Sequence, residues 1–145
     1  MSDPPRSAPP VVSVIVPTLG RSPLLQAGLE ALRADDGPRR ELLLVAPRGV
    51  DLGGVEDLAD RVLRLGGLPG FTVANNRALE VARGRFVALV NDDAVIQRGW
   101  LAALVAALRV RPDVAGVQGV NVRLDGEGKG GPTARIDGWG LGWNR

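Results

Sequence analysis

The sequence predicts an α/β fold in which helices flank a mostly parallel sheet. Short apolar stretches, rich in leucine and β-branched residues, alternate along the chain with stretches whose leucines recur at helical spacing. This alternation is typical of parallel strands joined by helical crossovers, because each crossover returns the chain to the same end of the sheet. The chain has 145 residues, 45% of them hydrophobic, which is enough for one domain with a buried core.

Five apolar stretches are predicted to be strands, since they are rich in β-forming residues and turn-forming residues bound them. They are residues 11–16, 41–45, 61–65, 86–90 and 114–122, the last as one strand or as two around Gly119. Residues 86–90 form an uninterrupted apolar run, which is typical of a strand buried on both faces of a parallel sheet. We therefore expect this fourth stretch to be the central strand.

Three helices are expected, at residues 23–34, 72–83 and 100–108, with a short helical turn at residues 55–60. Ser22 and Thr72 are suited to cap the first two helices, because a hydroxyl can accept a bond from a free backbone N–H group. The inner face of the second helix is expected to consist of its apolar side chains, Val73, Ala78, Leu79 and Ala82.

The chain is expected to have three parts. Residues 1–10 are rich in proline and predict a disordered leader, and without an apolar segment they do not form a signal peptide. Residues 11–124 form the α/β domain, and residues 125–145 a tail rich in glycine and tryptophan. No apolar stretch is long enough to span a membrane.

The composition excludes several kinds of chemistry. The chain has no cysteine and no histidine, so disulfides, thiolate zinc sites and a histidine general base are excluded, and any metal must be bound by carboxylates. A formal net charge of +2 and an aromatic content of 3% give no basis for nucleic-acid binding.

The triplet Asn91-Asp92-Asp93 directly follows the fourth predicted strand. Ligands of parallel α/β sheets bind at the carboxyl ends of the strands, and the loops at residues 17–21 and 46–49 should open on the same edge. Adjacent carboxylates repel each other unless a cation relieves the repulsion, and Mg²⁺ or Mn²⁺ bound together with phosphates would do so. The alternative is a solvated turn in which an aspartate caps the next helix. Neither of the glycine-rich phosphate-binding fingerprints is present.

Three segments resemble the nucleotide-sugar-binding half of the family 2 glycosyltransferases, which have the Rossmann-like GT-A fold. They are VSVIVPTLGR at residues 12–21, GFTVANNRALEVARGRFVALVNDDA at residues 70–94, and GWL at residues 99–101. Their order and spacing extend the resemblance over roughly residues 11–123. The resemblance implies a GT-A fold, truncated at its C-terminal end, and a nucleotide-sugar donor.

The resemblance also implies roles for the acidic triplet. Asp93 matches the carboxylate that coordinates Mg²⁺ or Mn²⁺ on the donor diphosphate, and Asp92 matches the one that faces the ribose or the metal-bound water. Asn91 fills the first position of the triplet. The other substrate-binding residues implied, against the base and ribose or near the nucleotide, are Pro17, Thr18, Leu19 and Asn76.

Two departures from the family pattern concern the donor base. Ala46 and Pro47 stand where the family has an aspartate that reads the base, and Gly20 stands where it usually has asparagine. A triplet that begins with asparagine occurs in relatives that resemble rhamnosyltransferases and other deoxysugar transferases. The expected donor is therefore a dTDP- or UDP-sugar.

The resemblance implies transfer of the sugar, with inversion, to a glycan or lipid-linked acceptor during polysaccharide synthesis for the cell envelope. We expect a cytoplasmic location, compatible with peripheral association at the inner face of the membrane. In the family a further acceptor-binding half supplies the general base, and nothing after Asn121 resembles it, so the catalytic base is expected beyond residue 145.

Two other classes of protein are alternatives to the transferase. The first is a non-catalytic nucleotide-sugar-binding module, which would use the same residues without turnover. The second is a phosphatase-like α/β domain, which needs a further aspartate at the end of the first strand. Pro17 and Thr18 occupy that position, so the sequence disfavours the phosphatase-like domain.

Overall fold

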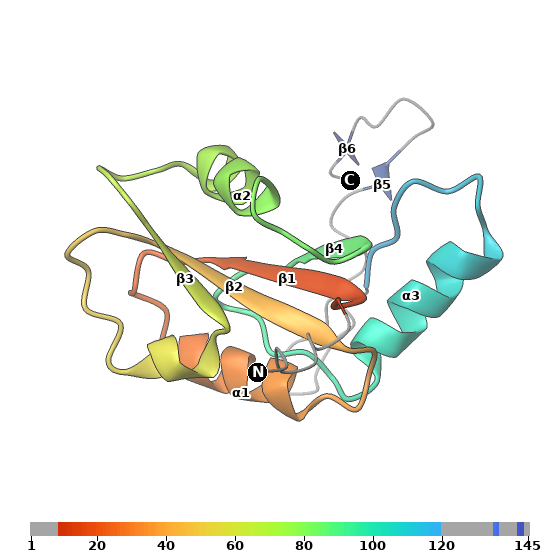
Figure 1. The fold of residues 1–145 in the computed structure, drawn as a ribbon, viewed down its shortest axis with the longest axis horizontal. Helices are drawn as coiled ribbons and strands as arrows, with labels where there is room; N and C mark the ends of the chain where they lie inside the picture. The colour runs from red at the N-terminus through yellow and green to blue at the C-terminus, as the bar shows by residue number, and fades with distance from the viewer. Residues whose placement is uncertain (1–8, 120–134, 137–141, 144–145) are drawn as a thin grey trace, which may run out of the picture. The chain divides into compact units, whose positions relative to one another are not determined.

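The computed structural model describes residues 9–119 together with the backbone of residues 135–136 and 142–143 (Figure 1). The chain forms two compact units, residues 1–102 and 103–145. The strands of the first unit are β1 (Val12–Pro17), β2 (Arg40–Pro47), β3 (Arg61–Leu65) and β4 (Phe86–Leu89). Its helices are α1 (Leu25–Ala34), the 3₁₀ helix η1 (Val55–Leu58) and α2 (Phe71–Leu79), and α3 (Trp100–Val110) begins in it. In the second unit β5 (Arg135–Ile136) pairs antiparallel with β6 (Gly142–Trp143).

The four strands of the first unit form one parallel sheet in the order β3-β2-β1-β4. Val12 of β1 is in register with Arg40 on one side and with Phe86 on the other, so the strands end close together at one edge. Figure 1 shows α2 on one side of this sheet, with α1 and η1 on the opposite side. This arrangement confirms the predicted α/β fold with a parallel sheet.

The core lies around β1 and β2, whose residues are almost all buried. Ile15, Leu43 and Val45 pack with Ala74 and Ala78 of α2. The buried face of α1 consists of residues at helical spacing, Leu25, Gly28, Leu29 and Leu32. Because each fully buried leucine contributes about 1.5–3 kcal/mol, these two strands and their helices hold the sheet edge rigidly.

The prediction that the fourth strand is central was wrong for the described part of the sheet. β4 is the last strand in the described order, and Val87 and Leu89 on one of its faces are 41% and 50% exposed. Only Val90, just after the strand, is buried. The central positions belong to β1 and β2, whose longer apolar runs fill the space between the helices.

The predicted inner face of α2 was only partly right. Ala78 is buried as predicted, but Val73 and Leu79 are 53% and 45% exposed, and the other buried positions are Ala74 and Asn75. Ala74 and Ala78 are one turn apart, and their small side chains let the helix approach the sheet closely, which turns the larger residues outward. Thr72 does not cap α2. The N-cap residue of this helix is Gly70, and no side-chain bond caps the helix there.

Other predictions at element ends also differed from the structure. Ser22 does not cap α1, because its Oγ accepts a bond from Leu24 N, at 3.2 Å, within a turn that precedes the helix. Residues 114–119 contain no strand, and residues 120–122 of that predicted strand lie outside the described residues. Most of the predicted leader and tail also lies outside them, so the predicted domain boundaries stay predictions.

Candidate functional site

A pocket of about 620 Å³ lies at the carboxyl edge of the sheet. Four parts of the first unit line it: residues 17–19 and 21–23 after β1, Val45 of β2, residues 69–71 with Ala74 at the start of α2, and residues 91–93 after β4. This volume is in the range of pockets that bind small molecules and cofactors. The structure therefore brings six of the seven predicted site residues to one pocket: Pro17, Thr18, Leu19, Asn91, Asp92 and Asp93.

Thr18 connects three strands at this edge. Its backbone N donates to Val45 O at 2.8 Å, and its hydroxyl donates to Asp92 Oδ2 at 2.5 Å. The same hydroxyl accepts a bond from Gly20 N at 2.9 Å, and Thr18 itself is only 6% exposed. Gly20 has a φ of +71°, and a Cβ there would lie 2.5 Å from Val50 Cγ1, so this turn requires glycine.

The acidic triplet forms a turn in which Ala94 N donates to Asn91 O at 3.2 Å. Asp92 is half-buried beside Thr18, whereas Asn91 and Asp93 are exposed at the pocket wall. The solvated-turn alternative is right about the turn but not about the helix cap, because the next helix, α3, begins only at Trp100. Asp92 and Asp93 line the pocket instead.

The donor set of the pocket suits a hard divalent cation that shares its ligands with a phosphate. The part of the chain that the structure describes contains no group of three or more acidic, histidine or cysteine side chains able to hold a metal alone. Mg²⁺ and Mn²⁺ sites at phosphates need only one or two protein carboxylates, because phosphate oxygens and water complete the shell. Asp92 and Asp93 supply this number.

The pocket also contains residues that were not among the predicted site residues. Arg21, Pro69 and Phe71 line the pocket; Arg21 is exposed, and Phe71 is 56% exposed. The available signal was the stretch of glycine and proline at residues 66–70, because this loop brings the start of α2 to the strand ends. Among the described residues that line the pocket, Arg21 is the one cation.

Asn76 is the predicted site residue that the structure does not bring to the pocket. It is exposed on α2, whereas its neighbour Asn75 is buried and donates from Nδ2 to Phe71 O at 2.9 Å. Among the described residues, none donates a hydrogen bond to the amide oxygen of Asn75. The role of Asn76 near a nucleotide stays a prediction.

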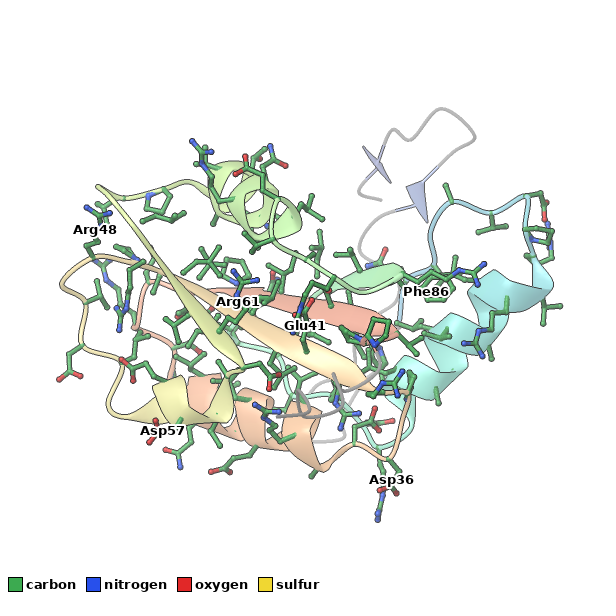
Figure 2. All side chains as sticks on the ribbon, viewed as in Figure 1. Asp36, Glu41, Arg48, Asp57, Arg61 and Phe86 are labelled. Carbon is green, nitrogen blue, oxygen red and sulfur yellow. The ribbon has the colours of Figure 1, made fainter. Side chains whose placement is uncertain are left out.

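The end of β2 gives the pocket an apolar wall. Val45 lines it, Ala46 and Pro47 are buried, and the next charged residue, Arg48, is exposed. Figure 2 shows Arg48 and Glu41 toward opposite ends of β2. Asp51, the next carboxylate along the chain, accepts a bond from Gly53 N at 2.9 Å and lies outside the pocket. Within the described part of the chain, no carboxylate at the end of β2 takes the place of the aspartate that the resemblance led us to expect there.

A parallel sheet with a ligand-sized pocket and paired carboxylates at its carboxyl edge defines a ligand-binding α/β protein. The chain belongs to glycosyl transferase family 2, whose sequence model matches residues 13–142. It is 36% identical over 124 residues to the uncharacterized protein y4gI of Sinorhizobium fredii, an alignment that covers 78% of this chain and 13% of that protein.

Two solved structures of similar fold carry bound nucleotide-sugars. TarS of S. aureus, residues 1–349, in complex with UDP-GlcNAc is 28% identical, with a TM-score of 0.60, over 70% of this chain and 32% of its own. The mannosyltransferase PcManGT of Pyrobaculum calidifontis, in complex with GDP-Man and Mn²⁺, is 30% identical, with a TM-score of 0.59, over 70% and 33%. The chain thus spans about a third of these structures. Among the described helices, none combines the length and apolar character needed to cross a membrane.

Proposed function

We propose that this chain forms the donor-binding part of a metal-dependent, inverting glycosyltransferase. The substrates would be a dTDP- or UDP-sugar and a glycan or lipid-linked acceptor, in the cytoplasm at the inner face of the membrane. The observation that carries the proposal is the position of Asp92 and Asp93 on the wall of one pocket with the loop after β1. Membership of glycosyl transferase family 2 and the nucleotide-sugars bound to the two structural neighbours support it.

In this proposal the carboxylates at the end of β4 bind the donor diphosphate through a cation. Asp93 is exposed and binds Mg²⁺ or Mn²⁺ directly, and Asp92 faces the ribose or the metal-bound water. A bound divalent cation supplies charge stabilisation for the diphosphate leaving group. The guanidinium of Arg21 lines the same pocket and donates to phosphate oxygens, for which its planar donor geometry is suited.

The base is assigned to the apolar side of the pocket. Val45, Pro69 and Phe71 line this side, with Pro17 and Leu19 from the loop after β1. Because no carboxylate stands at the end of β2, base recognition in this proposal relies on shape and on backbone groups. A pyrimidine is proposed because the Asn-led triplet resembles that of deoxysugar transferases.

The general base that deprotonates the acceptor hydroxyl is proposed to lie beyond residue 145. Asp92 and Asp93 are the only carboxylates among the described residues that line the pocket, and both are assigned to the donor side. The same observation favours the second candidate, a module that binds a nucleotide-sugar without turnover. Hydrolysis or transfer of the donor sugar by the longer protein would distinguish the enzyme from the module.

Calorimetric titration of UDP, dTDP and GDP into the chain, with Mn²⁺ or with EDTA, tests the donor site. The expected result is that UDP or dTDP binds much more tightly with Mn²⁺ than with EDTA, and that this difference is lost in Asp93→Asn. Asp57→Asn is the matched control, since Asp57 is an exposed carboxylate on η1, as Figure 2 shows. Equal binding with EDTA, or unchanged binding in Asp93→Asn, would overturn the proposal.

A further inference from the structure

The one donor hydrogen of the Thr18 hydroxyl is already used within the protein. A threonine hydroxyl has one hydrogen to donate, and Thr18 gives it to Asp92 Oδ2 at 2.5 Å. One of its lone pairs accepts the bond from Gly20 N at 2.9 Å, and the side chain is buried. The resemblance places this residue against the base and ribose, but its donor is already used by a carboxylate of the acidic triplet.

Thr18 is itself held in place from two sides. Its backbone N donates to Val45 O of β2. Thr18 also directly follows β1, and β1 pairs with β4, with a last bond from Val90 N to Ile15 O. A hydroxyl fixed by two strands therefore holds one oxygen of Asp92. Asp93, one residue further on, is exposed and remains free to adapt to a ligand.

We propose that Thr18 is a positioning residue, whose hydroxyl fixes the rotamer of Asp92 so that its second carboxylate oxygen is held toward the ribose or the metal-bound water. This inference rests on the proposed function. Groups that orient metal-site ligands typically change metal affinity 10- to 100-fold when they are removed, because the ligand must then be ordered at the moment of binding.

Two substitutions separate this role from simple packing. Thr18→Ser keeps the hydroxyl and both of its bonds, whereas Thr18→Val keeps the branched shape and loses them. Thr72→Val is the matched control, because Thr72 is exposed on α2 and does not line the pocket. Circular dichroism and thermal unfolding establish that each variant is folded, and Thr18→Ala, which also removes the hydroxyl, takes the place of Thr18→Val if Thr18→Val does not fold.

The first readout is the ratio of the UDP dissociation constant in EDTA to that in Mn²⁺. Thr18→Val is expected to lower this ratio by about 10- to 100-fold, while the value in EDTA stays nearly constant. Thr18→Ser and Thr72→Val should keep the ratio of the original chain. A ratio unchanged in Thr18→Val, or a fall in Thr18→Ser equal to that in Thr18→Val, would overturn the inference.

The second readout needs no ligand and therefore separates this inference from the proposed function. Three-bond coupling constants of Asp92 should report a single χ1 rotamer in the original chain and in Thr18→Ser, and averaged rotamers in Thr18→Val. A single rotamer in Thr18→Val contradicts the positioning role even if nucleotide binding is lost. If Asp92 shows averaged rotamers in Thr18→Val but the original chain never binds UDP in a metal-dependent way, the positioning of Asp92 by Thr18 is supported and the proposed donor site is refuted.

Discussion

Glu41 of β2 and Arg83, which precedes β4, are joined at the amino edge of the sheet, opposite the pocket. The Glu41 carboxylate accepts bonds from Arg83 N at 2.6 Å and from Arg83 Nε at 2.9 Å, although only 2% of the glutamate side chain is exposed. Ser13 Oγ of β1 donates to the same carboxylate at 2.6 Å and accepts a bond from Gly84 N at 2.8 Å. This network fixes where β4 begins and so contributes to where its acidic turn lies.

Replacing Glu41 by alanine is expected to destabilise the chain by about 1–3 kcal/mol, because Ser13 Oγ and Arg83 N lose their acceptor. The measurement is the free energy of unfolding from urea titration. Glu80→Ala is the control: Glu80 pairs with Arg77, and both side chains are about 60% exposed, so a change of no more than about 0.5 kcal/mol is expected. Equal effects of the two substitutions would contradict the structural role of Glu41.

The same network predicts a dependence of stability on pH. Burial raises the pKa of Glu41, but the hydrogen bonds from Ser13 and Arg83 outweigh it and hold this pKa below its usual value of 4.5. Glu41 therefore adds stability above pH 4.5, and this contribution is lost as the pH falls through its lower pKa in the folded state. Urea midpoints between about pH 3 and pH 7 should fall less steeply in Glu41→Gln than in the original chain. If the urea midpoints of the two chains fell equally steeply with pH, the lowered pKa of Glu41 would be refuted.

Gly84→Ala is expected to displace the start of β4. A Cβ at this position would lie 2.3 Å from Ser13 N and 2.6 Å from Val12 C, and these backbone atoms cannot move without shifting β1. We expect a loss of about 1–3 kcal/mol of stability. Gly66→Ala is the control, since nothing lies within 4 Å of a Cβ there. Thermal unfolding of both variants is the check, and a melting temperature of Gly84→Ala equal to that of Gly66→Ala would contradict the close approach.

Arg21→Ala is expected to weaken binding of UDP in Mn²⁺ by about tenfold or more, because a charge-assisted bond to phosphate is lost. Binding of uridine, which has no phosphate, should be unaffected. Arg77→Ala is the control, because Arg77 is exposed on α2 outside the pocket and pairs with Glu80. An equal loss for UDP and uridine would show that Arg21 supports the loop rather than the diphosphate.

The sequence was informative where local chemistry decides the structure. Apolar runs and their bounding residues located β1, β2 and β3 to within a few residues, and the triplet after β4 identified the pocket edge. The position of β4 in the sheet was not predictable, because the apolar character of residues 86–90 does not indicate which strands lie beside them. The rotation of α2 follows from the fit of Ala74 and Ala78 against β1 and β2, which is also a tertiary effect.

The hydrogen bonds of Thr18 to Asp92 and of Ser13 to Glu41 could not be predicted from the sequence either, since each joins residues far apart along the chain. The chain order alone places Thr18 and the acidic triplet at one edge, but it does not assign the hydroxyl to a carboxylate rather than to a ligand. Asn75 and Asn76 show the same limit: adjacent identical residues lie on different faces of α2, and only the packing of the helix separates them.

The central claim is that a divalent cation binds at Asp92 and Asp93 together with a nucleoside diphosphate. Paramagnetic broadening by Mn²⁺ in the NMR spectrum of the UDP-saturated chain tests it most directly. We expect the amide signals of residues 18–21 and 91–94 to be lost first, and those of residues 55–60, around the exposed carboxylate of Asp57 on η1, to persist. Broadening that begins around η1, or that is the same with and without UDP, would contradict it.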